Sequence, residues 1–288
     1  TIDHPTTVEV FGGTLESDGD VSVGAADNST IRALSGSLAL SLKTALGAGV
    51  SVNDITSDVL ASIARNSRLD AGGSVRLSGA RAAGIDAIAA SGSGGSGAGI
   101  AGSMAINTIG GSVVAEATEA ESLEADANVL IGARDLSEIF SLGGGVEASG
   151  SSAAIGGAVS INHISTDVRA ELTSSLSALG EGDAALLVPA GDLPDENEGG
   201  DEPTTDEDPD TSSFTANLSN IPSSDISVPI LVSSDDSAAS GISADDEGVR
   251  PIRGAGIVAS TAADVTSIEA NVGAASGMAV SGSTGVTM

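Results

Sequence analysis

The chain has 288 residues, 40 of them acidic and 10 basic, and its formal net charge of −30 repels phosphate backbones and anionic surfaces, which argues against nucleic acid as a partner. It has no Cys, which excludes disulfides, thiolate metal sites and Cys nucleophiles. With no Trp, no Tyr and three Phe, a core must be built from Val, Ile, Leu and Ala in thin layers, and this favours a narrow, repetitive body.

The N-terminal residues TIDHPTTVEV contain no basic region followed by an apolar run. We therefore expect any secretion signal to lie outside this chain. Nowhere does the sequence reach the roughly 18 consecutive apolar residues of a membrane span, so we also expect no membrane insertion by this segment.

A repeat is the main feature of the sequence. The segments GVSVN, SMAIN and AVSIN end at Asn53, Asn107 and Asn162, so successive copies lie 54 and then 55 positions apart. The alignment extends to both sides of each Asn. It places Val59, Val113 and Val168 in one column and Ile31, Ile85 and Ile139 in another. A fourth copy begins at Ala255 and runs to the end of the chain.

Apolar residues alternate within each copy, as in Val-x-Ala-x-Ile, which is typical of strands with one buried face. Frequent Gly, Ser, Asn and Asp indicate short strands separated by turns, and they make helix the less favoured alternative. A period of this length would divide into three coils of roughly 18 residues each. Because the coils of a parallel β-helix stack at about 4.8 Å, an inward side chain lies over its counterpart, and small residues suit such columns.

The prediction is therefore an all-β fold, a right-handed parallel β-helix or solenoid into which an acidic loop or small subdomain is inserted. Its expected parts are β-helix repeats over residues 1–180, the insertion over residues 181–254, and a continuation of the β-helix over residues 255–288. The repeated Asn is interpreted either as a corner residue in the left-handed conformation or as an ordinary turn residue without stacking.

The insertion contains a strongly acidic run without basic residues between Asp192 and Asp210. Such a run cannot bury itself, and a solvated loop is one interpretation. The other is a calcium site. The stretch DEDPD spaces Asp206, Asp208 and Asp210 at every second position, which suits hard oxygen ligands, although the Gly and bidentate acid of an EF-hand loop are missing. Calcium is thus the one cofactor candidate.

Evidence for catalysis in the sequence is weak. The two His residues, His4 and His163, are far apart, and the repeat column that contains His163 has Asp54 and Thr108 in other copies. The acidic pair Asp235 and Asp236 resembles carboxylates that cleave glycosides, but sugar clefts normally need aromatic platforms. We therefore expect no enzyme activity.

The segments VLIGARDLSEIFSLGGGVEASG and AAIGGAVSIN-HISTDVRAEL resemble the repeats of leukotoxin-type filamentous adhesins, which are large secreted bacterial surface exoproteins. The resemblance covers residues 21–180 and 255–288. It implies a parallel β-helical stalk, an extracellular or cell-surface location, and a role in adhesion. It supplies no catalytic residues.

The expected function is a structural and adhesive stalk segment of a large exported bacterial protein, which associates with itself into fibres. The expected partners are other copies, neighbouring repeats of the same protein, or a glycan or protein on a host or cell surface. The alternatives are a polysaccharide-active enzyme on a β-helix, and a calcium-stabilised binding module.

Overall fold

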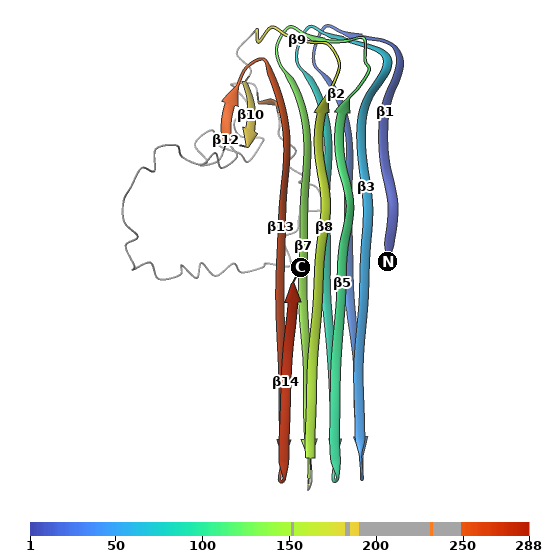
Figure 1. Ribbon diagram of the computed structural model, residues 1–288, viewed down its shortest axis with the longest axis vertical. Helices are drawn as coiled ribbons and strands as arrows, with labels where there is room; N and C mark the ends of the chain where they lie inside the picture. Colours follow the sequence, from blue (N-terminus) through green and yellow to red (C-terminus); the bar gives the residue numbers. More distant parts are fainter. Residues whose placement is uncertain (151–152, 182–184, 190–230, 233–248, 288) are drawn as a thin grey trace, which may run out of the picture.

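The computed structural model describes residues 1–150, 153–181, 185–189, 231–232 and 249–287. All regular structure in these parts of the chain is β-strand, and the strands of the two large sheets pair in parallel (Figure 1). The predictions of an all-β chain and of parallel pairing are confirmed. None of the described residues forms a helix that is long and apolar enough to span a membrane.

Two large sheets, called sheet I and sheet II, make up the body. In sheet I the order is β14 (Met278–Thr287), β8 (Ala153–Leu172), β5 (Ala98–Ala117) and β3 (Ala45–Ala71), and β1 (Ile2–Ser17), β6 (Ser122–Ala125) and β9 (Leu176–Ala178) extend it. In sheet II the order is β13 (Ala255–Ala275), β7 (Val129–Ser149), β4 (Val75–Gly95) and β2 (Val21–Ser41). A small antiparallel sheet joins β10 (Ala185–Pro189), β11 (Leu231–Val232) and β12 (Val249–Ile252).

Each repeat contributes one long strand to each sheet, and equivalent residues of successive repeats are register partners. Val59, Val113 and Val168 pair in one column of sheet I, and Ile31, Ile85 and Ile139 pair in one column of sheet II, as the alignment predicted. Ala255, the first residue of the fourth copy, pairs with Val129. The fourth copy therefore stacks on the third in register across a sequence separation of 126 residues.

The expected division of each period into three short coils is wrong. One period forms one layer of two strands, and β2, β4 and β7 each have 21 residues. At roughly 3.3 Å per residue such a strand extends about 70 Å, whereas each layer adds only about 4.8 Å along the stack. The long axis of the described body accordingly runs along the strands (Figure 1). The body is a slab.

Glycines explain why the expectation of frequent turns failed. Gly47 and Gly49 lie inside β3, where a Cβ would collide with backbone carbonyl oxygens of sheet II. A Cβ at Gly49 would lie 2.7 Å from the carbonyl oxygen of Ala90, and one at Gly47 would overlap that of Gly92. These glycines allow the two sheets to approach closely, and they do not end a strand.

The upper half of the slab, distant from the turns that follow β2 and β4, holds an ordinary apolar core. Val59 and Val113 are almost fully buried, and Val168 packs partly buried against the same cluster. A second cluster of Ile and Ala surrounds Ile55, Ile85 and Ile139. The predicted columns of slim apolar side chains therefore face inward here.

The lower half, which comprises residues 34–53 and their equivalents in later layers, has the opposite arrangement. Ser51 and Asn53 face inward and are buried, while their neighbours Val50 and Val52 are exposed. Because the glycine-lined sheets approach so closely here, the described interior is filled mainly by Gly, Ala and small polar side chains, and the buried Glu147 is a larger exception. The branched apolar side chains therefore point outward.

Candidate functional site

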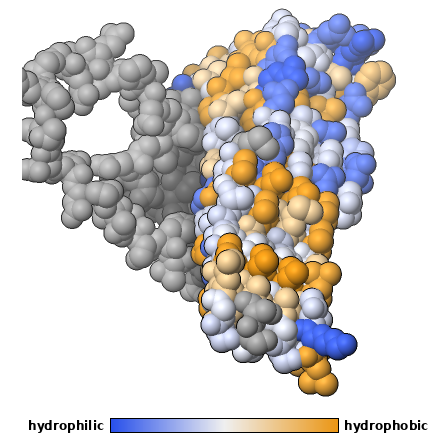
Figure 2. Space-filling model, turned by 60° about the horizontal axis from the view of Figure 1, so that its bottom comes forward, coloured by the Kyte–Doolittle hydropathy of each residue, from blue (hydrophilic) through white to orange (hydrophobic). Residues whose placement is uncertain are grey.

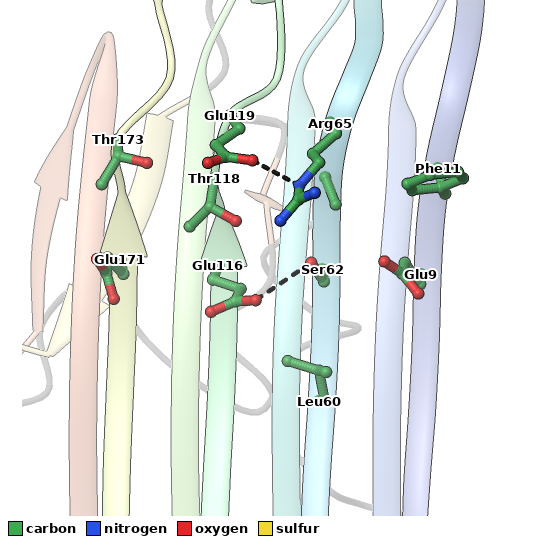
Figure 3. A pocket seen from close by; sticks show the side chains of 11 residues that line it. Glu9, Phe11, Leu60, Ser62, Arg65, Glu116, Thr118, Glu119, Glu171 and Thr173 are labelled. Carbon is green, nitrogen blue, oxygen red and sulfur yellow. Dashed lines mark hydrogen bonds and ion pairs between the residues drawn. The ribbon is translucent and has the colours of Figure 1, made fainter.

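A shallow groove of about 480 Å³ lies on the outer face of sheet I in the upper half (Figure 3). Glu9, Glu116 and Glu171 line it from β1, β5 and β8, in one row that also contains Ser62 of β3. The Ser62 hydroxyl donates to Glu116 Oε1 at 3.4 Å. This row of carboxylates on neighbouring strands attracts cations and basic groups.

Among the described residues that line the groove, Arg65 is the one basic side chain, and it lies at the upper rim. Arg65 Nε lies 2.6 Å from Glu119 Oε2, and both side chains are well exposed (Figure 3). Phe11 of β1 is 67% exposed at the side of the groove. The groove thus combines an acidic floor, one exposed ion pair and one aromatic ring, which suits contact with a polar partner surface.

A second acidic group lies on the outer face of sheet II. Glu138 of β7 pairs with Asp264 of β13, and Asp86 of β4 is close by. Burial raises the pKa of Glu138, and the negative charges of Asp264 and Asp86 raise it further. These carboxylates repel one another and attract a proton or a cation.

The outer faces of the lower half are apolar on both sheets. Leu38 and Val146 of sheet II are 75% and 61% exposed, and Leu46 and Val52 of sheet I are 69% and 64% exposed. Figure 2 shows such hydrophobic residues gathered over the lower part of one side of the slab. Contiguous exposed apolar surface is typical of protein contact sites, ligand grooves and aggregation-prone faces.

Buried charges separate the two apolar clusters of the upper half. Asp27, Arg81 and Asp135 are successive members of one inward column of sheet II. Arg81 is fully buried, its Nε donates to Asp135 Oδ1 at 2.7 Å, and its Nη1 donates to the carbonyl oxygens of Ser57 and Gly110 at 2.7 and 3.0 Å. The opposite charges in successive layers fix the stacking register at this level.

The repeated Asn residues form a ladder inside the lower half. Asn53 Nδ2 donates to Asn107 Oδ1 at 2.8 Å, and Asn107 Nδ2 donates to Asn162 Oδ1 at 2.7 Å. All three are buried in the middle of β3, β5 and β8. Both sequence interpretations of this Asn, the corner and the unstacked turn, are therefore wrong, because each amide satisfies its neighbour across the layers.

The predicted calcium ligands Asp206, Asp208 and Asp210 lie outside the described residues, as do Asp235 and Asp236. Within the described parts, no group of three or more His, Cys, Asp or Glu side chains is placed to hold a metal ion. The structure does not bring His4 and His163 together: His4 Nε2 lies 3.2 Å from Asp27 Oδ1, whereas His163 extends the column of Asp54 and Thr108 in sheet I.

The sequence analysis did not predict the buried charges of Arg81 and Asp135, although the sequence contains a signal for them. In an alternating strand, Arg81 and Asp135 have the same parity as the buried Val75 and Val129. A charged residue at an inward position indicates a buried pair or a ligand site.

Comparisons with protein-family models, with curated proteins and with solved structures find no match for this chain.

Proposed function

We propose that this chain is a segment of a right-handed parallel β-solenoid that acts as a structural and adhesive stalk in a large exported bacterial cell-surface protein. The observation that carries the proposal is the stacking of four copies in register, with one repeat period per layer. Continuous backbone ladders of this kind resist extension along the stack, and further layers add by the same pairing.

The dimensions of each layer support a stalk that is wide relative to the length it gains per repeat. About 54 residues are used for each step of about 4.8 Å, so length is gained slowly, while each layer contributes wide strand faces. A stalk built in this way offers large lateral surfaces, and adhesion would use these surfaces. The acidic groove, with Glu116 and Glu171, is the polar candidate contact for a glycan or protein on another surface.

Self-association would use the apolar outer faces of the lower half. Neighbouring slabs that pack these faces together would remove Leu38 and Val146 from water, while the acidic upper half would remain solvated. This arrangement limits association to one half of each slab, and it would align copies side by side into fibres.

Single-molecule pulling along the stack tests the stalk. We expect layers to detach one at a time, each releasing about 190 Å of chain, because 54 residues extend to about 3.5 Å each. Unfolding in one event at low force would contradict a mechanical role. Adhesion is tested with beads that carry the chain: retention on cells no higher than that of bare beads would contradict it.

Sedimentation measurements test the fibre proposal. The double variant Leu38→Glu with Val146→Glu should be monomeric at concentrations where the unaltered chain associates. Leu42→Glu is the matched control, because Leu42 is 89% exposed in the turn after β2 and outside the strand face. An unaltered chain that stays monomeric would contradict side-by-side assembly.

A further inference from the structure

A buried carboxylate lies inside the lower half. Glu147 of β7 faces the space between the sheets, and its side chain belongs to a residue that is only 1% exposed. Neither of its carboxylate oxygens has a hydrogen-bond partner among the described residues. Burial raises the pKa of Glu147. A carboxylate at such a position needs a proton or a counter-ion, because an unpaired buried charge is costly.

Two glycines make room for this carboxylate. Gly156 lies opposite on β8, and a Cβ at that position would overlap the Glu147 head group. Gly145 precedes Glu147 by two residues and faces the same way. A Cβ on Gly145 would lie 2.5 Å from Glu147 Oε1, 2.6 Å from Asn271 Oδ1 and 3.5 Å from Ser91 Oγ. Three oxygens from three successive layers therefore converge above Gly145.

The register explains this convergence. Ser91 of β4 and Asn271 of β13 are the two neighbours of Gly145 in its column, one layer to each side. The Asn271 amide donates from Nδ2 to the carbonyl oxygen of Gly282 at 2.6 Å, which leaves Oδ1 directed at the space. Like Glu147, Asn271 Oδ1 and Ser91 Oγ have no hydrogen-bond partner among the described residues.

A neighbouring hydroxyl adds to the same group. Ser93 pairs with Glu147 in the next inward column, and its Oγ is buried without a described partner. Ser91 and Ser93 are 7% and 4% exposed. The set is therefore one carboxylate, one amide oxygen and two hydroxyls. Among the described residues, no basic side chain pairs with the carboxylate of Glu147.

We infer that Glu147, Asn271 and Ser91 form a binding site for one hard metal cation of calcium size. Calcium binds oxygen ligands at about 2.3–2.6 Å. Glu147 Oε1 and Asn271 Oδ1 lie 2.5 and 2.6 Å from the position that a Cβ on Gly145 would take. The two oxygens are therefore at most about 5 Å apart, which is close enough for both to ligate one ion held between them. An ion held among these oxygens would join β4, β7 and β13, and it would neutralise the buried carboxylate.

Calorimetric titration of the chain with calcium chloride, after treatment with a chelator and in about 150 mM potassium chloride to screen surface charges, tests the site. We expect one strong site per chain. Glu147→Gln should weaken this site at least tenfold and abolish the rise in thermal midpoint that calcium produces. Glu16→Gln is the matched control, since it removes one exposed carboxylate and should change neither result.

Asn271→Ala provides a second variant, because Asn271 is only half-buried in the outermost described strand of sheet II and its loss spares the core. It should also weaken calcium binding about tenfold while Glu147 stays charged. Equal calcium responses in the unaltered chain and in Glu147→Gln would show binding to surface acids alone and would overturn the inference. No calcium response at all, with Glu147→Gln simply more stable at neutral pH, would assign the carboxylate a proton and would also overturn it.

Discussion

Replacing Arg81 by Met should cause a large loss of stability. The side chain of Arg81 is fully buried and donates three hydrogen bonds, to Asp135 and to two carbonyl oxygens. Arg81→Met keeps most of the side-chain volume but leaves Asp135 charged, fully buried and without its ion pair. Breaking a buried ion pair from one side costs about 3–5 kcal/mol. Among the described residues Nη2 of Arg81 has no hydrogen-bond partner, so it already costs some desolvation in the folded state. We therefore expect the free energy of unfolding to fall by about 3 kcal/mol.

Urea unfolding followed by circular dichroism measures this loss, because the chain has no Trp or Tyr for fluorescence. With a denaturant slope of about 1–3 kcal/mol per molar, the midpoint should fall by roughly 1–3 M. The matched control is Arg32→Met. Arg32 also pairs with an Asp in the next layer, Asp86, at 3.3 Å, but its side chain is 65% exposed. Such surface pairs contribute about 0–1 kcal/mol.

A second variant separates the charge from the packing. Arg81→Met combined with Asp135→Asn removes both charges, while the new amide still offers Ser137 an acceptor. This double variant should recover most of the lost stability, because an uncompensated carboxylate is the main cause of the loss. A double variant as unstable as Arg81→Met alone, or a single variant no weaker than the Arg32 control, would refute the reasoning.

Three further predictions concern single positions. Asn107→Val interrupts the Asn ladder at its centre, so two hydrogen bonds are lost and two buried amides lose a partner. The free energy of unfolding, measured in urea, should fall by about 2–3 kcal/mol. A fall of less than about 0.5 kcal/mol would contradict a stabilising ladder. Gly111→Ala should lower the free energy of unfolding by more than about 2 kcal/mol, because Gly111 has φ +116° and a Cβ there would overlap the Ser57 carbonyl. Gly132→Ala is the control: a Cβ at Gly132 would meet no atom within 4 Å, so the free energy of unfolding should change by less than about 0.5 kcal/mol. Glu138→Gln should raise the thermal midpoint at about pH 7.5 and leave it unchanged below the ordinary Glu pKa of about 4.3. Because the pKa of Glu138 is raised in the folded state, its protonated form stabilises the fold at low pH, and that stability is lost as pH rises through the folded pKa. Equal midpoints for the two chains at the higher pH would contradict this prediction.

The repeat alignment predicted much of the fold correctly. Columns such as Val59 with Val113 were read from spacing and residue type, and they are register partners in parallel strands. Alternation of apolar residues also predicted strand structure throughout the repeats. These features are local or strictly periodic, so the sequence displays them directly.

The candidate site could be predicted only in part. Small residues were expected to stack inward in columns, and Ser51 does face inward. The inward position of Asn53 and the exposure of Val50 and Val52 were not expected. Alternation shows that two faces differ, and it does not show which face is inside. The convergence of Glu147 with Asn271, which are 124 positions apart in the chain, also depends on stacking across the insertion.

The sequence by itself determined that the protein is all-β, that it repeats with a nearly constant period, and that equivalent residues stack in parallel, since period and residue type suffice for these conclusions. Only the tertiary structure decided that one period makes a single two-strand layer, that glycines bring the sheets together in the lower half, and that the buried charges meet across layers. The physical reason is that the distance between two facing sheets depends on residues of both at once. That distance decides which side chains fit inside, and no single stretch of the chain encodes it.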